Sequence, residues 1–233
     1  MSARPPRGLT LPAGGDTVVV RCSTVADGDF HIETSPAALA HRRQAFQPGR
    51  WSQLDEIHGV VVHQVEAPGE HDGSVGDGAV TTARGVVLAC WVGDCAPIAL
   101  VGESGVIGVA HAGWKGAWDG VLEATVAAMR DRGERGGISA YLGPCIHPCC
   151  YEFGPADLAT FTGRFGPTVG GTTTWGTPSL DMPAVVTACL GAVGVVADHT
   201  LTGCTRCTPG AWFSHRRNDA GRHVLTVVKM ASA

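Results

Sequence analysis

The hydrophobic and polar positions along the chain follow a strand-like pattern in many short segments. Apolar runs of about four to eight residues, each bounded by turn residues, are typical of strands. Such runs occupy residues 17–22, 58–65, 85–92, 97–102, 105–112, 138–144, 193–198 and 223–230. Several of them are apolar almost without interruption, which predicts a sheet that is covered on both faces.

Helical spacing replaces this pattern elsewhere. The clearest helix carries its core residues on one face, namely Val121, Leu122, Thr125, Val126 and Met129. Shorter helices are predicted at 36–45, where Pro36 lies in the first turn, and at 155–164 and 183–190. Because strands and helices are mixed throughout, the predicted fold class is α/β, with one domain or two closely merged ones in 233 residues.

The composition is that of a globular chain, with 44% hydrophobic and 16% charged residues. The net charge is -4 and no long basic run occurs, so the electrostatic footprint of a nucleic-acid-binding protein is missing. The apolar runs are shorter than the roughly 20 residues that a membrane span requires. Pro and Gly interrupt residues 1–16 before an apolar signal segment forms. We therefore expect a flexible N-terminal tail at 1–16, a folded domain at 17–233 and a cytoplasmic protein.

The chain contains nine cysteines, an odd number. Without an export signal this count argues against a disulfide framework, and most of the cysteines are expected to be small buried residues. Two predicted loops are rich in cysteine: GPCIHPCCYEFG holds Cys145, Cys149 and Cys150, and GCTRC holds Cys204 and Cys207 as a C-x-x-C motif. The alternatives for these residues are buried thiols, a redox pair, and a structural zinc site shared between the loops.

Polar residues stand at the boundaries of three predicted apolar strands. His58 begins one strand, Cys95 follows another beside Asp94, and His111 ends a third. Two imidazoles and one thiolate form a ligand set that zinc accepts, with an open fourth position in catalytic sites. Taken singly, residues of this kind are more often hydrogen-bonded histidines or buried thiols than metal ligands, and no short-range signature such as H-E-x-x-H is present.

The segment GVAHAGWKGAWDG, residues 108–120, joins a strand to a helix through a glycine-rich turn. The first N–H groups of a helix attract anions, and Lys115 adds a positive charge beside Gly113 and Trp114. The turn is a candidate phosphate site, or else the glycines only permit a tight turn and Lys115 is solvated. Arg216, in the segment FSHRRNDAGR, is a further candidate for bidentate phosphate binding, or it belongs to the charged surface.

Five sequence blocks together resemble the YfiH family, which is also called the laccase-domain or polyphenol-oxidase family and includes FAMIN-like purine nucleoside phosphorylases. The blocks are DEIHG, GDCAP, HAGWKG, GPCIHPCCYEFG and FSHRRNDAGR, and the resemblance extends from about Trp51 to Arg222. It implies a single-domain, mixed β-sheet sandwich that is flanked by helices.

The resemblance also implies a site and an activity. Its motifs place zinc ligands at His58, Cys95 and His111, with Asp94 beside them to orient a ligand or to move a proton. The implied reaction is phosphorolysis of the purine nucleosides adenosine, inosine and methylthioadenosine, with phosphate as the second substrate. Hydrolytic deamination of adenosine is implied as an accompanying activity.

Three positions depart from the pattern that is usual in the family. Glu56 replaces Gln before the first ligand, Lys115 replaces Arg in the G-W-R-G block, and Val25 replaces Arg. Lysine keeps the charge of arginine but not its bidentate geometry. Two alternatives to the zinc enzyme follow. One is a copper-dependent polyphenol oxidase, since two histidines and one cysteine resemble a blue-copper set; the other is a metal-binding family member without catalytic activity.

Overall fold

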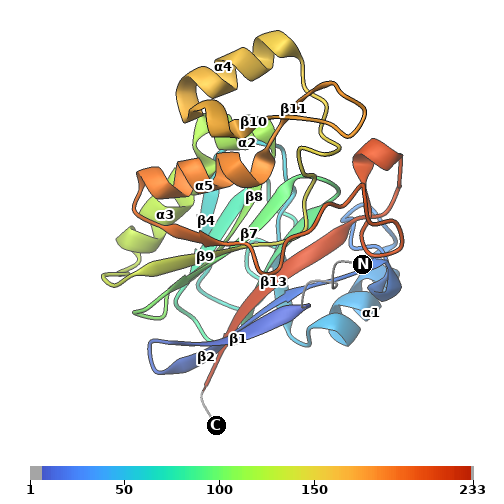
Figure 1. Ribbon diagram of the computed structural model, residues 1–233. Helices are drawn as coiled ribbons and strands as arrows, with labels where there is room; N and C mark the ends of the chain where they lie inside the picture. Colours follow the sequence, from blue (N-terminus) through green and yellow to red (C-terminus); the bar gives the residue numbers. More distant parts are fainter. Residues whose placement is uncertain (1–6, 232–233) are drawn as a thin grey trace.

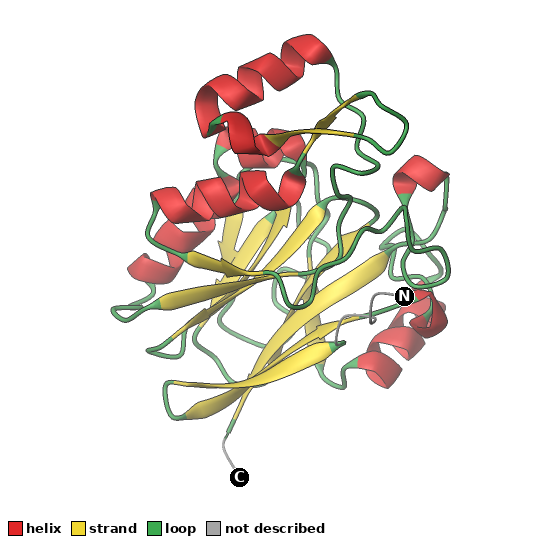
Figure 2. Ribbon diagram, in the orientation of Figure 1, coloured by secondary structure: helices red, strands yellow, loops and turns green. Residues whose placement is uncertain are grey.

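Two β-sheets packed face to face form the centre of the molecule, and helices cover the outer face of each sheet (Figure 1, Figure 2). The structure is a computed structural model that describes residues 7–231. This mixed α/β sandwich confirms the predicted fold class. A sheet covered on both faces was expected, and the six-stranded sheet has this character: every residue of its strand β7 (Ala96–Gly102) is buried.

The first sheet has five strands in the order β1-β2-β13-β6-β3. Neighbouring strands are antiparallel, except that β3 is parallel to β6. The strands are β1 (Gly8–Ala13), β2 (Asp16–Cys22), β13 (His223–Met230), β6 (Val86–Val92) and β3 (Arg50–Gln53). The C-terminal strand therefore lies at the centre of this sheet, between strands from the first hundred residues.

The second sheet has six strands in the order β12-β9-β7-β8-β5-β4. Its central pairs are antiparallel, whereas β12 is parallel to β9 and β4 is parallel to β5. Besides β7, the strands are β12 (Val196–Asp198), β9 (Ile138–Leu142), β8 (Ile107–Ala112), β5 (Gly78–Thr81) and β4 (Val62–Gln64). A separate hairpin is formed by β10 (Gly170–Thr172) and β11 (Pro178–Leu180).

The helices lie on the two outer sides of the sandwich (Figure 2). The six-stranded sheet is covered by α2 (Trp114–Asp119), α3 (Val121–Asp131) and α5 (Met182–Ala192), and the five-stranded sheet by α1 (Pro36–Phe46). The remaining helix, α4 (Pro155–Phe165), packs against α5 and the β10–β11 hairpin. Short 3-10 helices are η1 (Val25–Asp27), η2 (Pro167–Val169) and η3 (His215–Arg217). Gly120 separates α2 from α3 with a φ of 98°, a conformation that glycine adopts without steric cost.

Apolar side chains fill the three spaces between these layers. Val20 and Ile107 belong to the cluster between the two sheets, and Leu122 belongs to the cluster between the six-stranded sheet and its helices. On the other side, the rings of Phe46 and Trp51 form an aromatic cluster beneath α1. Each fully buried side chain of this size contributes roughly 1.5–3 kcal/mol, so the framework is stabilised independently of any bound metal.

The N-terminal segment is more ordered than the sequence predicted. A flexible tail was expected at 1–16, but residues 8–16 form β1 and the tight turn that pairs it with β2. The tail prediction is wrong there because Leu9 and Leu11 pack against the core between the sheets. The beginning of the predicted tail, residues 1–6, lies outside the described residues.

The strand predicted at 58–65 is also wrong in part. Only Val62–Gln64 pairs as a strand, and His58 lies in the preceding loop with a φ of 63°. The left-handed backbone of His58 is incompatible with an extended strand, and the loop conformation directs this residue toward the site described below.

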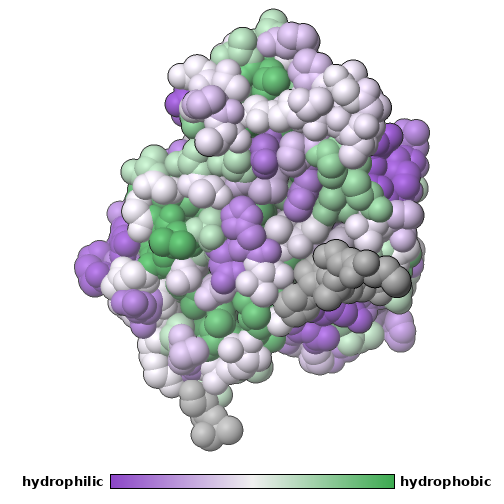
Figure 3. Space-filling model, in the orientation of Figure 1, coloured by the Kyte–Doolittle hydropathy of each residue, from purple (hydrophilic) through white to green (hydrophobic). Residues whose placement is uncertain are grey.

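Among residues 7–231, no helix has both the length and the apolar character that a membrane crossing requires. On the face drawn in Figure 3, hydrophobic areas are small and are separated by neutral and hydrophilic ones.

His223, the first residue of β13, is fully buried. Its Nε2 donates a hydrogen bond of 3.2 Å to the carbonyl oxygen of Pro144, whereas Nδ1 has no hydrogen-bond partner within the described part of the chain. Burial lowers the pKa of His223 to about 4, against the opposing effects of the Pro144 carbonyl and of Asp94.

This histidine is expected to make stability fall as the pH is lowered from about 6.5 to about 4. In that range His223 is protonated in the unfolded chain but remains neutral in the folded chain. The free energy of unfolding is therefore about 3 kcal/mol lower at pH 4 than at neutral pH. The variant His223→Gln should show a weaker pH dependence when urea midpoints are compared at pH 7 and pH 5. Identical pH dependence in the two proteins would contradict the assignment.

Candidate metal centre

Three side chains that are remote in the sequence converge at the edge of the six-stranded sheet where β8 ends and β7 begins. The ligand atoms of His58, Cys95 and His111 all lie within 4.8 Å of one another. Cys95 Sγ is 3.5 Å from His58 Nε2, and the centroids of the two imidazole rings are 4.8 Å apart. A tetrahedral zinc ion, with its usual bond lengths, holds a nitrogen and a sulfur ligand about 3.5 Å apart. The three side chains therefore fit one metal ion.

Sheet pairing and a tight turn bring these residues together. His111 lies in β8 opposite Pro97 of β7, so the residues just before β7 reach the same edge of the sheet. Asp94 adopts a φ of 99° there, and this turn places Cys95 beside His111. His58 enters from the loop before β4. We refer to His58, Cys95 and His111 as the metal cluster.

Asp77, which lies just before β5, organises the metal cluster. Its Oδ1 accepts hydrogen bonds from His111 Nδ1 and from the His58 N–H, both at 2.8 Å. Its Oδ2 accepts a third, of 2.7 Å, from the Gly59 N–H. Because Nδ1 of His111 is held by a carboxylate, Nε2 is left to bind a metal, as is common for ligating histidines. Asp77 was not among the site residues predicted from the sequence, although a charged residue immediately before a buried strand was a usable signal.

Electrostatics keep two groups of the site negatively charged. Burial raises the pKa of the Cys95 thiol, but the charge of His111 and hydrogen bonds with His111 and His58 outweigh it and lower the pKa to about 6. Burial also raises the pKa of Asp77, but the hydrogen bonds from His111, Gly59 and His58 bring it below its usual value. Thiolate is the form of cysteine that binds metals, so the site is prepared for a cation.

Glu56 lies on the other side of His111. Its Oε2 is 3.7 Å from His111 Nδ1, too far for a hydrogen bond, and its Oε1 accepts one of 3.0 Å from the Trp91 N–H. Burial raises the pKa of Glu56 to about 8, against the attraction of His111 and the hydrogen bond from Trp91. From the sequence, Glu56 was only a departure from the pattern that the resemblance implies; in the structure its side chain is buried beside the metal cluster.

Asp94, next to Cys95 in the chain, holds two later segments in place through its side chain. Its Oδ1 accepts a hydrogen bond from Thr205 Oγ1 (2.5 Å), and its Oδ2 accepts two, from Ser214 Oγ (3.0 Å) and from the Arg216 N–H (2.7 Å). These contacts position the segment that carries Arg216. The expected role of Asp94 in orienting a ligand or moving a proton stays a prediction.

Gly113, which precedes α2, is in close contact with the metal cluster. A Cβ atom at this position would lie 2.4 Å from His58 Cδ2 and 3.3 Å from Cys95 Sγ. The first distance is a severe clash, so the hydrogen atom of glycine is what allows the His58 ring to reach Cys95.

The variant Gly113→Ala is therefore expected to displace His58 and to lose the metal of this site while the protein remains folded. Metal content per chain and the circular dichroism spectrum check the two parts of this expectation. Gly163→Ala is the matched control, because a Cβ at position 163 in α4 meets nothing within 4 Å. Full metal content in Gly113→Ala would show that the close contact does not matter.

A cavity of about 430 Å³ opens beside the metal cluster. This volume is within the range of small-molecule binding sites. In addition to the metal cluster, Glu56 and Asp94, its walls contain aromatic, imidazole and guanidinium groups, contributed by His31, Trp91, Trp114, Tyr151, His215, Arg216 and Arg222. The cavity thus combines a metal cluster, flat rings and positive charges.

The four candidate phosphate-binding residues are placed differently. Gly113, Trp114 and Arg216 line the cavity, whereas Lys115 is exposed on α2 and is not among the residues that line it. The guanidinium carbon of Arg216 lies 4.9 Å from the centroid of the Tyr151 ring. The structure therefore brings three of the four candidates to the cavity and leaves Lys115 outside it.

Comparison with known proteins identifies the family. Residues 22–230 match the family described as multi-copper polyphenol oxidoreductase laccase. The chain belongs to this family. It is 35% identical over 197 residues to a purine nucleoside phosphorylase of Streptomyces griseus, covering 80% of this chain and 79% of that protein. It is 34% identical over 228 residues to a purine nucleoside phosphorylase of Deinococcus radiodurans, covering 93% of this chain and 85% of that protein.

Solved structures show the same fold. A DUF152 protein of Neisseria meningitidis has a TM-score of 0.76 at 25% identity, covering 97% of this chain and all of that one. YfiH of Bacillus licheniformis has a TM-score of 0.76 at 20% identity, covering 94% of this chain and 97% of that one. The resemblance to the YfiH family is thus confirmed.

Proposed function

We propose that this protein is a zinc-dependent purine nucleoside phosphorylase that acts on adenosine, inosine and methylthioadenosine and also deaminates adenosine. The observation that carries the proposal is the convergence of His58, Cys95 and His111 in the wall of one cavity. The relatives from Streptomyces griseus and Deinococcus radiodurans are named purine nucleoside phosphorylases, which supports the same activity for this chain.

The donor set of the metal cluster fits zinc. Two imidazoles and a thiolate are common zinc ligands, and three protein ligands leave a fourth position for a reactant, as in catalytic sites. Asp77 fixes the ring of His111 through Nδ1, and the low pKa of Cys95 favours its thiolate. Zinc held by these residues would supply a Lewis acid that polarises an oxygen of the reactants.

The cavity suits a nucleoside in size and in the chemistry of its walls. Trp114 is 39% exposed although it packs edge-on against Phe153, so part of its ring is free to contact a purine base. Trp91 and His31 provide a second pair of rings, with centroids 4.5 Å apart. Flat rings of this kind are typical surfaces for packing against another aromatic system.

Arg216 is the best-placed group for phosphate. Both Arg216 and Arg222 line the cavity, but Arg222 Nη1 already donates to the carbonyl oxygens of Asp219, Ala220 and Gly221. Arg216 Nη1 donates one weaker bond of 3.2 Å, to the carbonyl oxygen of Glu152. In phosphorolysis a phosphate oxygen forms a bond to ribose C1′ while the bond from C1′ to the base breaks, so an anion must be held close to the sugar.

Arg216→Ala is expected to raise the KM for phosphate by about 10- to 100-fold, because a hydrogen bond to a charged group contributes about 1.5–3 kcal/mol. The matched variant Lys115→Ala removes a positive charge that is also exposed but lies outside the cavity, and it should leave this KM unchanged. Initial rates at varied phosphate concentration give the KM for phosphate of both variants and so show which of the two residues binds phosphate. A larger effect of Lys115→Ala would return the phosphate site to the start of α2.

The activity itself is tested with purified, zinc-loaded protein and each of the three nucleosides, with and without phosphate. Chromatography should detect the free base and the sugar 1-phosphate only when phosphate is present. The sugar product is ribose 1-phosphate from adenosine and inosine and 5-methylthioribose 1-phosphate from methylthioadenosine. Inosine should form from adenosine without phosphate. If none of these products forms, the protein is not this enzyme, and a metal-binding family member without catalytic activity becomes the better description.

The family description favours copper-dependent oxidation of phenols as a second candidate function. Two histidines and one cysteine also match part of a blue-copper ligand set. Metal analysis of protein purified without added copper, together with an assay for phenol oxidation, distinguishes the two. Copper in stoichiometric amount with phenol oxidation would favour the oxidase.

A further inference from the structure

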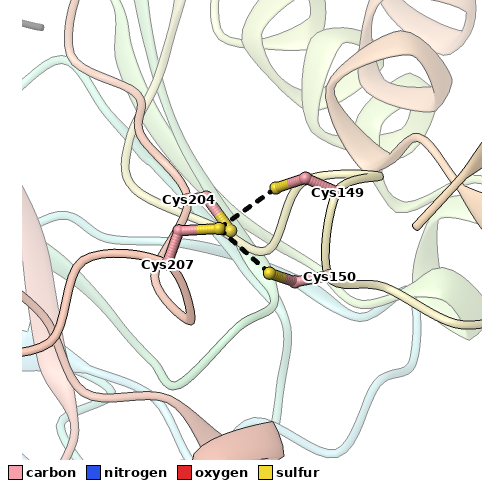
Figure 4. A group of neighbouring side chains, drawn as sticks. All are labelled: Cys149, Cys150, Cys204 and Cys207. Atoms are coloured by element: carbon pink, nitrogen blue, oxygen red, sulfur yellow. Dashed lines mark hydrogen bonds between the residues drawn. The ribbon is translucent and has the colours of Figure 1, made fainter. Parts of the chain in front are cut away.

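Four cysteines converge on the side of the molecule where the loop after β9 meets the loop after β12. The sulfur atoms of Cys149, Cys150, Cys204 and Cys207 all lie within 4.8 Å of one another. Cys207 Sγ is 3.3 Å from Cys149 Sγ and 3.0 Å from Cys150 Sγ. Figure 4 shows the four thiols pointing toward a common centre, two from each loop. We refer to them as the four-cysteine cluster.

Backbone contacts hold the two loops together beside this cluster. Cys145 and Cys204 form a parallel β-bridge, in which the Cys145 N–H donates to the Gly203 carbonyl (3.2 Å) and the Thr205 N–H donates to the Cys145 carbonyl (3.0 Å). Cys150 and Cys204 are 5% and 9% exposed, whereas Cys207 is exposed. The convergence is therefore fixed by the fold and is open to solvent on one side.

The geometry favours a metal over a disulfide. Four sulfur ligands around one zinc ion, each at about 2.3 Å, lie about 3.8 Å apart. This value lies between the 3.0 Å that separates Cys150 Sγ from Cys207 Sγ and the 4.8 Å within which all four sulfur atoms lie. A disulfide needs about 2.05 Å and uses only two of the four thiols. Cys204 and Cys207 have the C-x-x-C spacing that structural zinc sites use, and Arg206 adds a positive charge beside Cys150 that favours thiolates.

We propose that Cys149, Cys150, Cys204 and Cys207 bind one structural zinc ion, distinct from the metal of the cavity. All four protein ligands are thiolates, so the coordination is closed and the ion has no position for a reactant. Binding releases the thiol protons to solvent and needs no oxidant. Among the common metals, tetrahedral coordination by four sulfur atoms is typical of zinc and of iron–sulfur centres.

The zinc ion would fix two walls of the cavity relative to each other. Cys150 is followed directly by Tyr151, which lines the cavity, and Cys207 lies upstream of Arg216 in the other wall. The guanidinium of Arg216 packs over the Tyr151 ring, so the two loops meet again at the cavity. The four-cysteine cluster joins the same loops at a second place.

Zinc counts in five proteins test the proposal without any activity assay. Wild-type protein purified under reducing conditions should contain two zinc ions per chain by mass spectrometry of the metals. Cys95→Ala should retain one, Cys204→Ser/Cys207→Ser should retain one, and the triple variant none. Cys145→Ser is the matched control, because the Cys145 thiol lies beside the four-cysteine cluster but is not part of it. This variant should retain both zinc ions. Retention of zinc by the triple variant, or its complete loss in Cys95→Ala, would overturn the proposal.

A second measurement covers the case in which Cys204→Ser/Cys207→Ser does not fold. Zinc-edge X-ray absorption of Cys95→Ala, whose cavity ligand is missing, should show only sulfur neighbours at about 2.3 Å. Peptide mapping without reduction should detect no disulfide among the four cysteines. A first shell containing nitrogen, or a disulfide that involves Cys207, would overturn the proposal, and neither readout depends on purine chemistry.

Discussion

Replacing Cys95 with alanine is expected to remove the metal from the cavity and to lower phosphorolysis of adenosine by about a thousandfold or more. Cys95 supplies the one anionic ligand of the metal cluster, and His58 and His111 alone would hold zinc weakly. Losses of this size are typical when one member of a catalytic unit is removed. Release of adenine, measured together with zinc content in the same preparation, checks both effects.

Cys189→Ala is the control for this variant. Cys189 is a buried cysteine of α5 that belongs to the core beneath the helices, so its replacement should lower the melting temperature slightly and leave metal and activity in place. Activity in Cys95→Ala close to that of the wild type would mean that the reaction does not depend on this ligand set.

Asp77→Asn is expected to weaken metal binding in the cavity by about 10- to 100-fold, as is typical when the partner of a ligating histidine is changed. The Asp77 carboxylate accepts hydrogen bonds from His111 Nδ1, His58 and Gly59 at once. An amide has one acceptor oxygen and places a donor group where an acceptor is needed. Zinc titration against a competing chelator measures the loss.

Glu56→Gln is the control for this variant. It makes the same carboxylate-to-amide change on the other side of the His111 ring. Glu56 is 3.7 Å from His111 Nδ1, and a glutamine oxygen can still accept the hydrogen bond from the Trp91 N–H. Glutamine is also the residue that the resemblance to the YfiH family implies at this position. The variant should therefore keep metal affinity and phosphorolysis near the wild-type values. Equal losses in Glu56→Gln and Asp77→Asn would remove the special role assigned to Asp77.

The sequence predicted most strands and helices because their apolar periods are distinct. The helix containing Leu122 and Met129 was predicted from its spacing, and the buried strand that contains His111 was predicted from its apolar run. β1 was missed because Pro and Gly around Leu9 and Leu11 hid a short alternating pattern. His58 was assigned to a strand because its left-handed φ depends on hydrogen bonds to Asp77, a residue that is 19 positions away.

The sequence predicted the metal cluster only from the types of residue that stand at the ends of strands. Two histidines and a cysteine suggested a metal, and the antiparallel pairing of β7 with β8 is what brings Cys95 next to His111. The organising role of Asp77 requires knowledge of the register between β5 and β8. Similarly, the convergence of Cys149 and Cys150 with Cys204 and Cys207 depends on a bridge between two loops that sequence spacing does not reveal.

The most direct test of a metal-centred purine site is an anomalous-difference map at the zinc absorption edge, from a crystal soaked with inosine without phosphate. We expect a peak about 2.0–2.3 Å from His58 Nε2, Cys95 Sγ and His111 Nε2, with nucleoside density in the adjoining cavity. A map in which no metal lies among these three atoms, while the nucleoside occupies another place, would contradict the proposed function.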